Sequence, residues 1–136
     1  MITIEQQLEY SKALLGIPQE YSNTPEYMFP PTGVCPGCAY APVYRMFLKV
    51  TGPKVVLIDV PGCGGTGLLV TDDNKPIDKL GCPFGNSASF ASGISAALQA
   101  QGDYETIVAP IVGDGAALDI GMGALSAAAE RNENMI

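Results

Sequence analysis

Two continuous runs of apolar residues stand out from the pattern of hydrophobic and polar positions, at 55–60 and 106–112. Each run is bounded by turn-forming residues, which is typical of a strand that is buried on both faces of a parallel sheet. The first run continues into a glycine-rich stretch at 61–67, and the second into Gly113-Asp114-Gly115. The pattern therefore predicts two core strands that each end in a loop able to approach a ligand closely.

A helix is predicted at 39–51, directly before the first strand. This segment places Val43, Phe47 and Val50 on one helical face. Gly52-Pro53 follows, a pair that ends helices because glycine favours the cap and proline cannot continue the hydrogen-bond ladder. The pattern therefore predicts that the chain turns from this helix into the first strand.

Two further helices are predicted from segments rich in Ala, Ser and Gly, at 86–100 and at roughly 117–131. Small side chains allow such a helix to approach another layer closely. Residues 71–85 are polar and rich in turn formers, and they predict no regular element. The alternation of helices with apolar strands predicts an α/β fold layered on a parallel sheet.

The N-terminal part of the chain is predicted to be separate from this domain. Residues 2–15 carry a partial amphipathic stripe, and residues 17–34 are rich in Pro, Tyr and Asn without a clear period. We therefore expect an N-terminal helix and extended arm at 1–32, and the main domain at 33–136.

Composition narrows the classes of function. Seven Lys and Arg against fourteen Asp and Glu give a net charge of −7, which disfavours nucleic-acid binding. Hydrophobic residues make up 47% and charged residues 15%, which predicts a surface that meets other chains. No basic leader and no apolar run of membrane-spanning length is visible, so we expect a cytoplasmic protein without a membrane partner. Four cysteines in such a protein favour metal or redox roles over disulfides.

Gly113-Asp114-Gly115 has the composition of a ligand-binding turn. Glycines let the backbone approach a ligand, and the N-terminus of a following helix offers free N–H groups to an anion. Asp114, at the carboxyl end of a strand, can bind a magnesium ion that also binds diphosphate oxygens. On the triplet alone, a plain turn in which Asp114 caps the helix is the simpler interpretation.

The four cysteines are a second candidate site. Cys35 and Cys38 form a CxxC pair, Cys63 lies on the loop after the first predicted strand, and Cys82 follows later. The residue types leave four interpretations open: a structural zinc site, a thioredoxin-like redox pair, packing of Cys63 and Cys82 as small hydrophobes, and an iron–sulfur cluster. A second CxxC is missing, and the CxxC follows a Pro- and Tyr-rich arm instead of a strand.

In their order and spacing, these segments resemble the β subunits of 2-oxoacid:ferredoxin oxidoreductases. Four segments carry the resemblance: Cys35-Pro36-Gly37-Cys38, the Gly62-Cys63 pair, Phe84-Gly85-Asn86 before a small-residue helix, and the stretch from Gly113 to Asn132. It covers about residues 33–134. The sequence departs from the family at Ala39, where glycine is usual, at Tyr40, where many members have a polar residue such as glutamate, and in having no histidine.

The resemblance implies a thiamine-diphosphate-binding fold, with a parallel sheet layered between helices and incomplete at the C-terminus. The implied metal ligands are Cys35, Cys38 and Cys63 for a 4Fe–4S cluster and Asp114 for magnesium. The residues implied beside the thiamine diphosphate are Gly113, Asp114, Gly115, Ala116, Ala117, Gly62, Gly85 and Asn86. The fourth cluster ligand is left open between Cys82, a cysteine beyond residue 136 and a partner. Cys82 lies outside the family pattern, and we expect it more readily near the cofactor pocket or in packing. No catalytic side chain is assigned.

By the same resemblance, the complete enzyme oxidatively decarboxylates a 2-oxoacid, with pyruvate preferred. Coenzyme A takes the acyl group, carbon dioxide leaves, and the cluster passes electrons to ferredoxin. The implied partners are α-, γ- and δ-type subunits, ferredoxin, the 2-oxoacid and coenzyme A. The chain ends at 136, where the next strand is expected, so we expect a truncated domain that is inactive alone.

Three rival hypotheses remain at this stage. A zinc-binding interaction module explains the CxxC pair and leaves the two glycine-rich strand ends unexplained. A thiamine-dependent decarboxylase fragment without a cluster explains Gly113-Asp114-Gly115 and leaves the cysteines unexplained. A fragment that binds no cofactor and folds only against a partner is the third.

Overall fold

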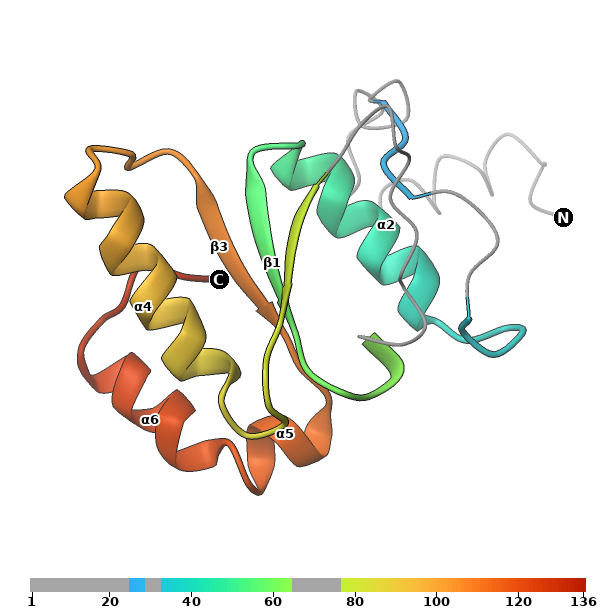
Figure 1. Ribbon diagram of the computed structural model, residues 1–136. Coiled ribbons are helices and arrows are strands. Elements are labelled where there is room, and N and C mark those ends of the chain that lie inside the picture. The colour runs from blue at the N-terminus through green and yellow to red at the C-terminus, as the bar shows by residue number, and fades with distance from the viewer. Residues whose placement is uncertain (1–24, 29–32, 65–76) are drawn as a thin grey trace, which may run out of the picture.

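Three parallel strands in the order β2-β1-β3 form the sheet of this protein (Figure 1). The computed structural model describes residues 25–28, 33–64 and 77–136 of the 136-residue chain. Along the chain the elements are α2 (Tyr40–Thr51), β1 (Val55–Asp59), β2 (Asp78–Gly81), α4 (Ser87–Ala100), β3 (Ile107–Ile111), α5 (Asp114–Leu118) and α6 (Met122–Glu130). The α/β class with a parallel sheet is confirmed. The helix predicted at 2–15 lies outside the described residues.

β1 is the central strand, and all five of its residues are buried. It pairs with β2 on one side and with β3 on the other, so that Leu57 lies opposite both Lys79 and Ala109. Helices cover both faces of the sheet, which explains why β1 is a continuous apolar run instead of an alternating one.

β2 was not predicted, because its sequence Asp78-Lys79-Leu80-Gly81 has no apolar alternation. It is an edge strand of four residues, and most of it is exposed. An edge strand of this kind needs little hydrophobic burial, since its backbone bonds to β1 supply the pairing. The interpretation of 71–85 as turns alone is therefore wrong at β2.

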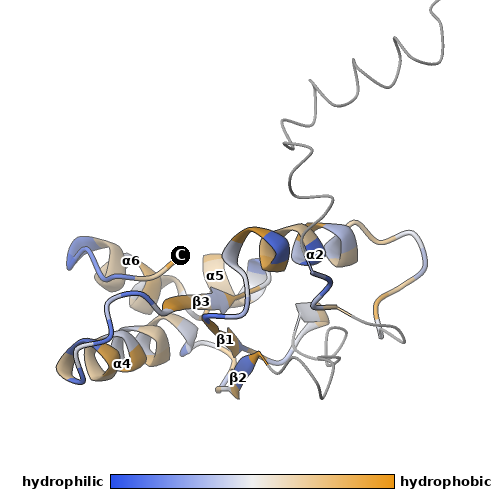
Figure 2. Ribbon diagram, turned by 90° about the horizontal axis from the view of Figure 1, so that it is seen from above, coloured by the Kyte–Doolittle hydropathy of each residue, from blue (hydrophilic) through white to orange (hydrophobic). Residues whose placement is uncertain are grey.

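The helices form two layers, with α2 on one face of the sheet and α4 and α6 on the other (Figures 1 and 2). Alternate residues of β1 point into the two layers. The α2 layer is a cluster formed by Tyr27, Tyr44, Leu48, Val55, Leu57, Ile77 and Ala109. The α4 layer is formed by Ile58, Val60, Cys82, Ala91, Val108 and Ala116. No helix within the described ranges is long and apolar enough to cross a lipid bilayer.

α2 begins at Tyr40, one residue later than predicted, and ends at Thr51 as predicted, and Gly52 is its C-cap. Its buried residues are Tyr44 and Leu48, whereas Val43 and Val50 are 67% and 59% exposed. Of the predicted apolar face, Phe47 packs against the core, whereas Val43 and Val50 point away from the sheet. Residues four apart lie on one side of a helix, and the pair at 44 and 48 takes the sheet-facing side.

The helix predicted at 117–131 is two helices, because the chain breaks at Asp119-Ile120-Gly121 between α5 and α6. A β-carbon built on Gly121 would collide with the carbonyl oxygen of Ala116. The backbone of the break therefore lies directly on the end of α5, and only glycine permits this approach. The interpretation as one helix starting near 117 is wrong on this point.

The C-terminal segment returns to the outer side of β3. The N–H of Ile136 donates to the carbonyl of Val108 over 3.0 Å, and Ser95 Oγ donates to the carbonyl of Asn134 over 3.0 Å. The N–H of Ile107 donates to the carbonyl of Lys54, the residue before β1. Because neighbouring residues of a strand alternate in direction, the backbone groups of Val108 and Pro110 point away from β1. Proline has no N–H, and Pro110 takes a position that makes no donor bond to β1.

Candidate cofactor site

Parallel strands deliver their following loops to one edge of the sheet, and here α2 also begins at this edge (Figure 1). The chain passes from β1 to β2 on one side and then, through α4, to β3 on the other side. The strand order therefore reverses between the neighbouring strands β1 and β3. Ligands of open α/β sheets bind outside the carboxyl ends of strands at such a point.

The Cys35–Cys38 segment is a tight turn that leads into α2. The N–H of Cys38 donates to the carbonyl of Cys35 over 3.0 Å, and Gly37 has φ 78°, a left-handed conformation that favours glycine. The N–H of Tyr40 lies 3.5 Å from the Cys38 Sγ, which accepts this hydrogen bond. Both cysteines are exposed free thiols, so the turn presents two sulfurs outward.

Cys63, also an exposed free thiol, lies on the loop after β1. The phenol of Tyr40 reaches this loop: a β-carbon built on Gly64 would lie 2.5 Å from Tyr40 Oη and 3.2 Å from Ile111 Cγ2. Burial raises the pKa of Tyr40, and the nearby thiols of Cys63 and Cys38 raise it further. Tyr40 is thus the point at which the turn before α2 meets the loop after β1.

Among the residues that the structure describes, no three His, Cys, Asp or Glu side chains gather closely enough to hold one metal ion. Cys35, Cys38 and Cys63 therefore do not converge on a single-ion site. Tyr40 bonds Cys38 through its backbone N–H and touches the loop of Cys63 at Gly64 with its phenol, which brings the two predicted ligand loops together.

Cys82 lies apart from the other three cysteines. It is 7% exposed and packs in the α4 layer with residues such as Ala91 and Val108. Burial raises the pKa of its thiol. Its N–H donates to the carbonyl of Asp59 over 2.9 Å, which extends the pairing of β2 with β1. Cys82 therefore packs as a small hydrophobic residue on the face of the sheet opposite to Tyr40.

Gly113-Asp114-Gly115 forms the turn between β3 and α5. Gly113 is extended and is the N-cap, and Asp114 is the first residue of the helix, with its side chain exposed. Asp114 is therefore not the capping residue that the simpler interpretation required. The N–H of Ala117 donates to the carbonyl of Gly113 over 3.0 Å. Ala117 is half-buried, and Ala116 is buried in the α4 layer.

The loop after β2 contacts this turn. A β-carbon on Gly115 would lie 3.3 Å from the Phe84 ring, and one on Gly85 would lie 3.2 Å from Ile120. Asn86 is exposed at the start of α4. The loop that carries the predicted Gly85 and Asn86 therefore touches the 113–115 turn through Phe84, whereas Gly85 itself meets Ile120. Gly62 belongs to the other group, on the loop that carries Cys63.

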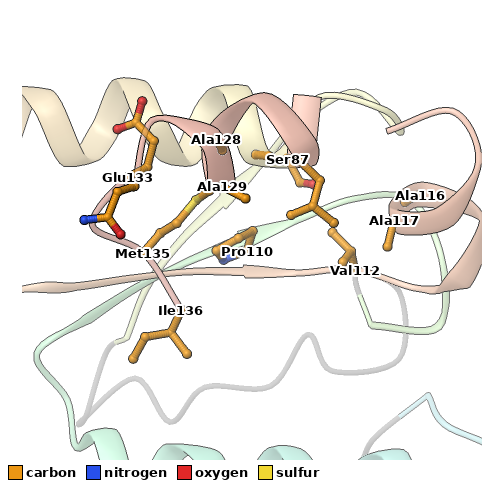
Figure 3. Close-up of a pocket in the computed structure, with 13 residues that line it drawn as sticks. Ser87, Pro110, Val112, Ala116, Ala117, Ala128, Ala129, Glu133, Met135 and Ile136 are labelled. Atoms are coloured by element: carbon orange, nitrogen blue, oxygen red, sulfur yellow. The ribbon is translucent and has the colours of Figure 1, made fainter. Parts of the chain in front are cut away.

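A pocket of about 500 Å³ lies beside this turn, between α4, β3, α5, α6 and the C-terminal segment (Figure 3). Its walls are mostly small apolar side chains, and of the predicted residues it includes Ala116 and Ala117. The other lining residues are Ser87, Ala88, Pro110, Val112, Leu125, Ala128, Ala129, Asn132, Glu133, Met135 and Ile136. This pocket could not be predicted from the sequence, because alanine in these segments is equally typical of helix packing.

A buried polar group on the α2 face was also not predicted. Asp59 is 5% exposed at the end of β1, and its Oδ2 lies 2.6 Å from Lys79 Nζ. Within the described residues, neither Asp59 oxygen accepts a well-directed hydrogen bond, and Tyr44 Oη is buried without a partner. Burial lowers the pKa of Lys79 and raises that of Tyr44. In the sequence, this buried polar group is indicated only by Asp59 itself, an acidic residue within the apolar run 55–60.

Comparisons with known proteins bear on these loops, although no protein-family model matches the chain. The chain is 36% identical over 127 residues to pyruvate synthase subunit PorB of Methanothermobacter thermautotrophicus, covering 90% of this chain and 41% of that protein. It is 30% identical over 118 residues to ketoisovalerate oxidoreductase subunit VorB of Pyrococcus furiosus, covering 82% and 38%.

A third relative is the β subunit of NADH-dependent phenylglyoxylate dehydrogenase of Aromatoleum evansii, 34% identical over 107 residues, which cover 75% of this chain and 23% of that protein. The chain therefore spans about two fifths of the length of the PorB and VorB relatives, and less of the third. The matched region takes in most of the chain in each comparison. The chain belongs to the β-subunit family of the 2-oxoacid:ferredoxin oxidoreductases.

Proposed function

We propose that this chain is the cofactor-binding part of a β subunit whose complete enzyme oxidatively decarboxylates a 2-oxoacid, with pyruvate as the preferred substrate. Coenzyme A accepts the acyl group, and ferredoxin accepts the electrons. The observation that carries the proposal is the meeting of the Cys38 turn with the Cys63 loop at Tyr40, beside the β1–β3 reversal point. The relatives named above, two of them pyruvate synthase and ketoisovalerate oxidoreductase subunits, support the same reaction class.

A 4Fe–4S cluster fits the cysteine donor set. Cys35, Cys38 and Cys63 are exposed free thiols, and Cys38 already accepts an N–H bond at sulfur. In a cluster each cysteine binds a different iron, so these ligands lie farther apart than the ligands of one ion. A bound cluster supplies one-electron transfer. In this proposal the three cysteines hold it, and a fourth ligand comes from elsewhere in the enzyme.

Thiamine diphosphate with magnesium fits the other group of loops. Asp114 is an exposed carboxylate at the carboxyl end of β3, which suits a hard cation. Gly113, Gly115, Ala116 and Ala117 surround it with small residues that leave room for a diphosphate group. The bound cofactor supplies stabilisation of a carbanion. The chain's own part is to hold the metal through Asp114 and to shield the site with Phe84.

The other residues proposed beside the cofactor belong to the neighbouring loops. In this proposal Gly62 lies beside the cofactor from the β1 loop, and Gly85 and Asn86 lie beside it from the β2 loop.

Large apolar side chains on α2 and around α5 are exposed, including Val43, Leu118 and Ile120. We assign this surface to contacts with the α-, γ- and δ-type subunits. A cytoplasmic location is proposed from the four cysteines without disulfides.

The test is to measure iron, sulfide and zinc in the anaerobically purified chain, together with its visible spectrum. We expect iron and sulfide in equal amounts and a broad band near 400 nm. Separate Cys35→Ser, Cys38→Ser and Cys63→Ser variants should lose iron, while the matched control Cys82→Ala keeps it. Zinc in place of iron would instead favour a zinc-binding interaction module. Equal iron in the Cys63→Ser variant would remove that residue from the ligand set.

A further inference from the structure

Tyr40 contacts two loops in addition to the hydrophobic cluster on the α2 face of the sheet. It begins α2, and its ring is half-buried against the cluster that covers the α2 face of the sheet. Its backbone N–H donates to Cys38 Sγ, and its phenol lies on the loop after β1. One residue therefore contacts both loops that carry the proposed cluster ligands.

The contact with the second loop depends on glycine at position 64. A β-carbon there would lie 2.5 Å from Tyr40 Oη, too close for two atoms that are not bonded. The hydroxyl therefore lies against the backbone of the residue that follows Cys63, while the N–H of the same tyrosine donates to Cys38 Sγ. A phenolic hydroxyl is a hydrogen-bond donor, and this one lies one residue from Cys63.

We propose that Tyr40 is a positioning residue that holds the Cys38 turn against the Cys63 loop and donates its one phenolic hydrogen to a sulfur of the iron–sulfur site. This inference rests on the proposed cluster ligands. A hydrogen bond to a thiolate withdraws electron density from the sulfur. It therefore stabilises the reduced form of a cluster more than the oxidised form and raises its reduction potential.

The substitution Tyr40→Phe separates this role from packing, because phenylalanine keeps the ring and removes only the hydroxyl. Tyr104→Phe is the matched control, since Tyr104 is 71% exposed and lies before β3 at the opposite edge of the sheet. Both variants and the original chain are purified anaerobically. Their iron content, thermal unfolding midpoint and midpoint reduction potential are measured, the last by redox titration followed by EPR.

The expected result is a more negative reduction potential in Tyr40→Phe, with Tyr104→Phe unchanged and the unfolding midpoint of both variants close to that of the original. Loss of iron from a Tyr40→Phe variant that remains folded would also support the proposal, because the hydroxyl alone was removed. Equal potentials and equal iron in all three proteins would overturn it. An original chain without iron would refute the cluster itself, and the inference with it, so the two failures are distinguishable.

Discussion

Lys79 on the edge strand β2 places its Nζ atom 2.6 Å from Oδ2 of Asp59, the last residue of the central strand β1. The two side chains are only 19% and 6% exposed, so the ion pair lies largely away from water. It ties the one strand that the sequence did not predict to the most buried strand of the sheet. Removing one partner of such a buried ion pair strongly destabilises the fold, because the other charge stays buried without compensation.

The variant Lys79→Met should therefore be less stable, because it leaves the Asp59 carboxylate buried without its charge partner. We expect a loss of about 3 kcal/mol in the free energy of unfolding, measured by urea denaturation at pH 7. Lys54→Met is the control: Lys54 pairs with Glu105 at the surface, where water screens the charges, and its loss should leave the urea midpoint unchanged. Equal midpoints for all three proteins would show that the Lys79–Asp59 pair does not stabilise the fold.

The stability of the chain should fall as the pH rises above 9, through Cys82. Burial raises the pKa of this thiol above its ordinary value of 9.0, so the unfolded chain loses the proton first. Stability is then fully present below pH 9 and is lost as the pH rises toward the folded pKa, by at most about 1.4 kcal/mol per pH unit. The measurement is the urea midpoint from pH 8 to 9.5 under a reducing agent. Cys82→Ala should flatten this dependence, and an unchanged slope in that variant would contradict the assignment.

Gly121→Ala should destabilise the chain, since the added β-carbon would collide with the Ala116 carbonyl oxygen at the break between α5 and α6. Backbone cannot move aside easily, and we expect a loss of about 1–3 kcal/mol by thermal or urea unfolding. Gly123→Ala is the matched control two residues later. A β-carbon there would meet no described atom within 4 Å, and alanine in a helix should stabilise by about 0.5 kcal/mol. The two substitutions are thus expected to have opposite signs.

Asp114→Asn should weaken magnesium-dependent binding of thiamine diphosphate by at least roughly tenfold, because the amide is a poorer ligand for a hard cation than the carboxylate. Calorimetric titration of the chain with the cofactor, with and without magnesium, measures the change. Asp119→Asn is the control, since Asp119 is also exposed and lies at the other end of α5. Identical affinities for the two variants would exclude Asp114 as the magnesium ligand.

The elements with strong local signals were predictable from the sequence. The apolar runs gave β1 and β3, and the small-residue segment 86–100 gave α4 to within one residue. These predictions succeed because strands covered on both faces and helices packed closely against a layer restrict the residue types strongly. α2 was also predicted, but not its buried side, because the side is fixed by the fit of Tyr44 and Leu48 to the sheet.

The failures occur where pairing or contact between distant segments decides the structure. β2 forms because its backbone completes the pairing with β1, which no property of its own four residues indicates. The break at Gly121 depends on the close approach of the Ala116 carbonyl. The position of the Tyr40 phenol depends on the missing side chain of Gly64 on another loop. The order of the candidate site segments along the chain was available from the sequence. The contact that joins Cys38 and Cys63 through Tyr40 was not.

Pro110 makes the outer side of β3 a poor docking site for another copy of the chain. A strand with free donors and acceptors along its outer side is a template on which the strand of another molecule can dock and begin aggregation. Pro110 contributes an acceptor to that side and no donor, and Ile136 already occupies the acceptor of Val108. A second copy that approached β3 would find its hydrogen-bond ladder interrupted at both positions. The sequence of β3 therefore protects concentrated solutions of this chain against self-association through the outer side of this strand.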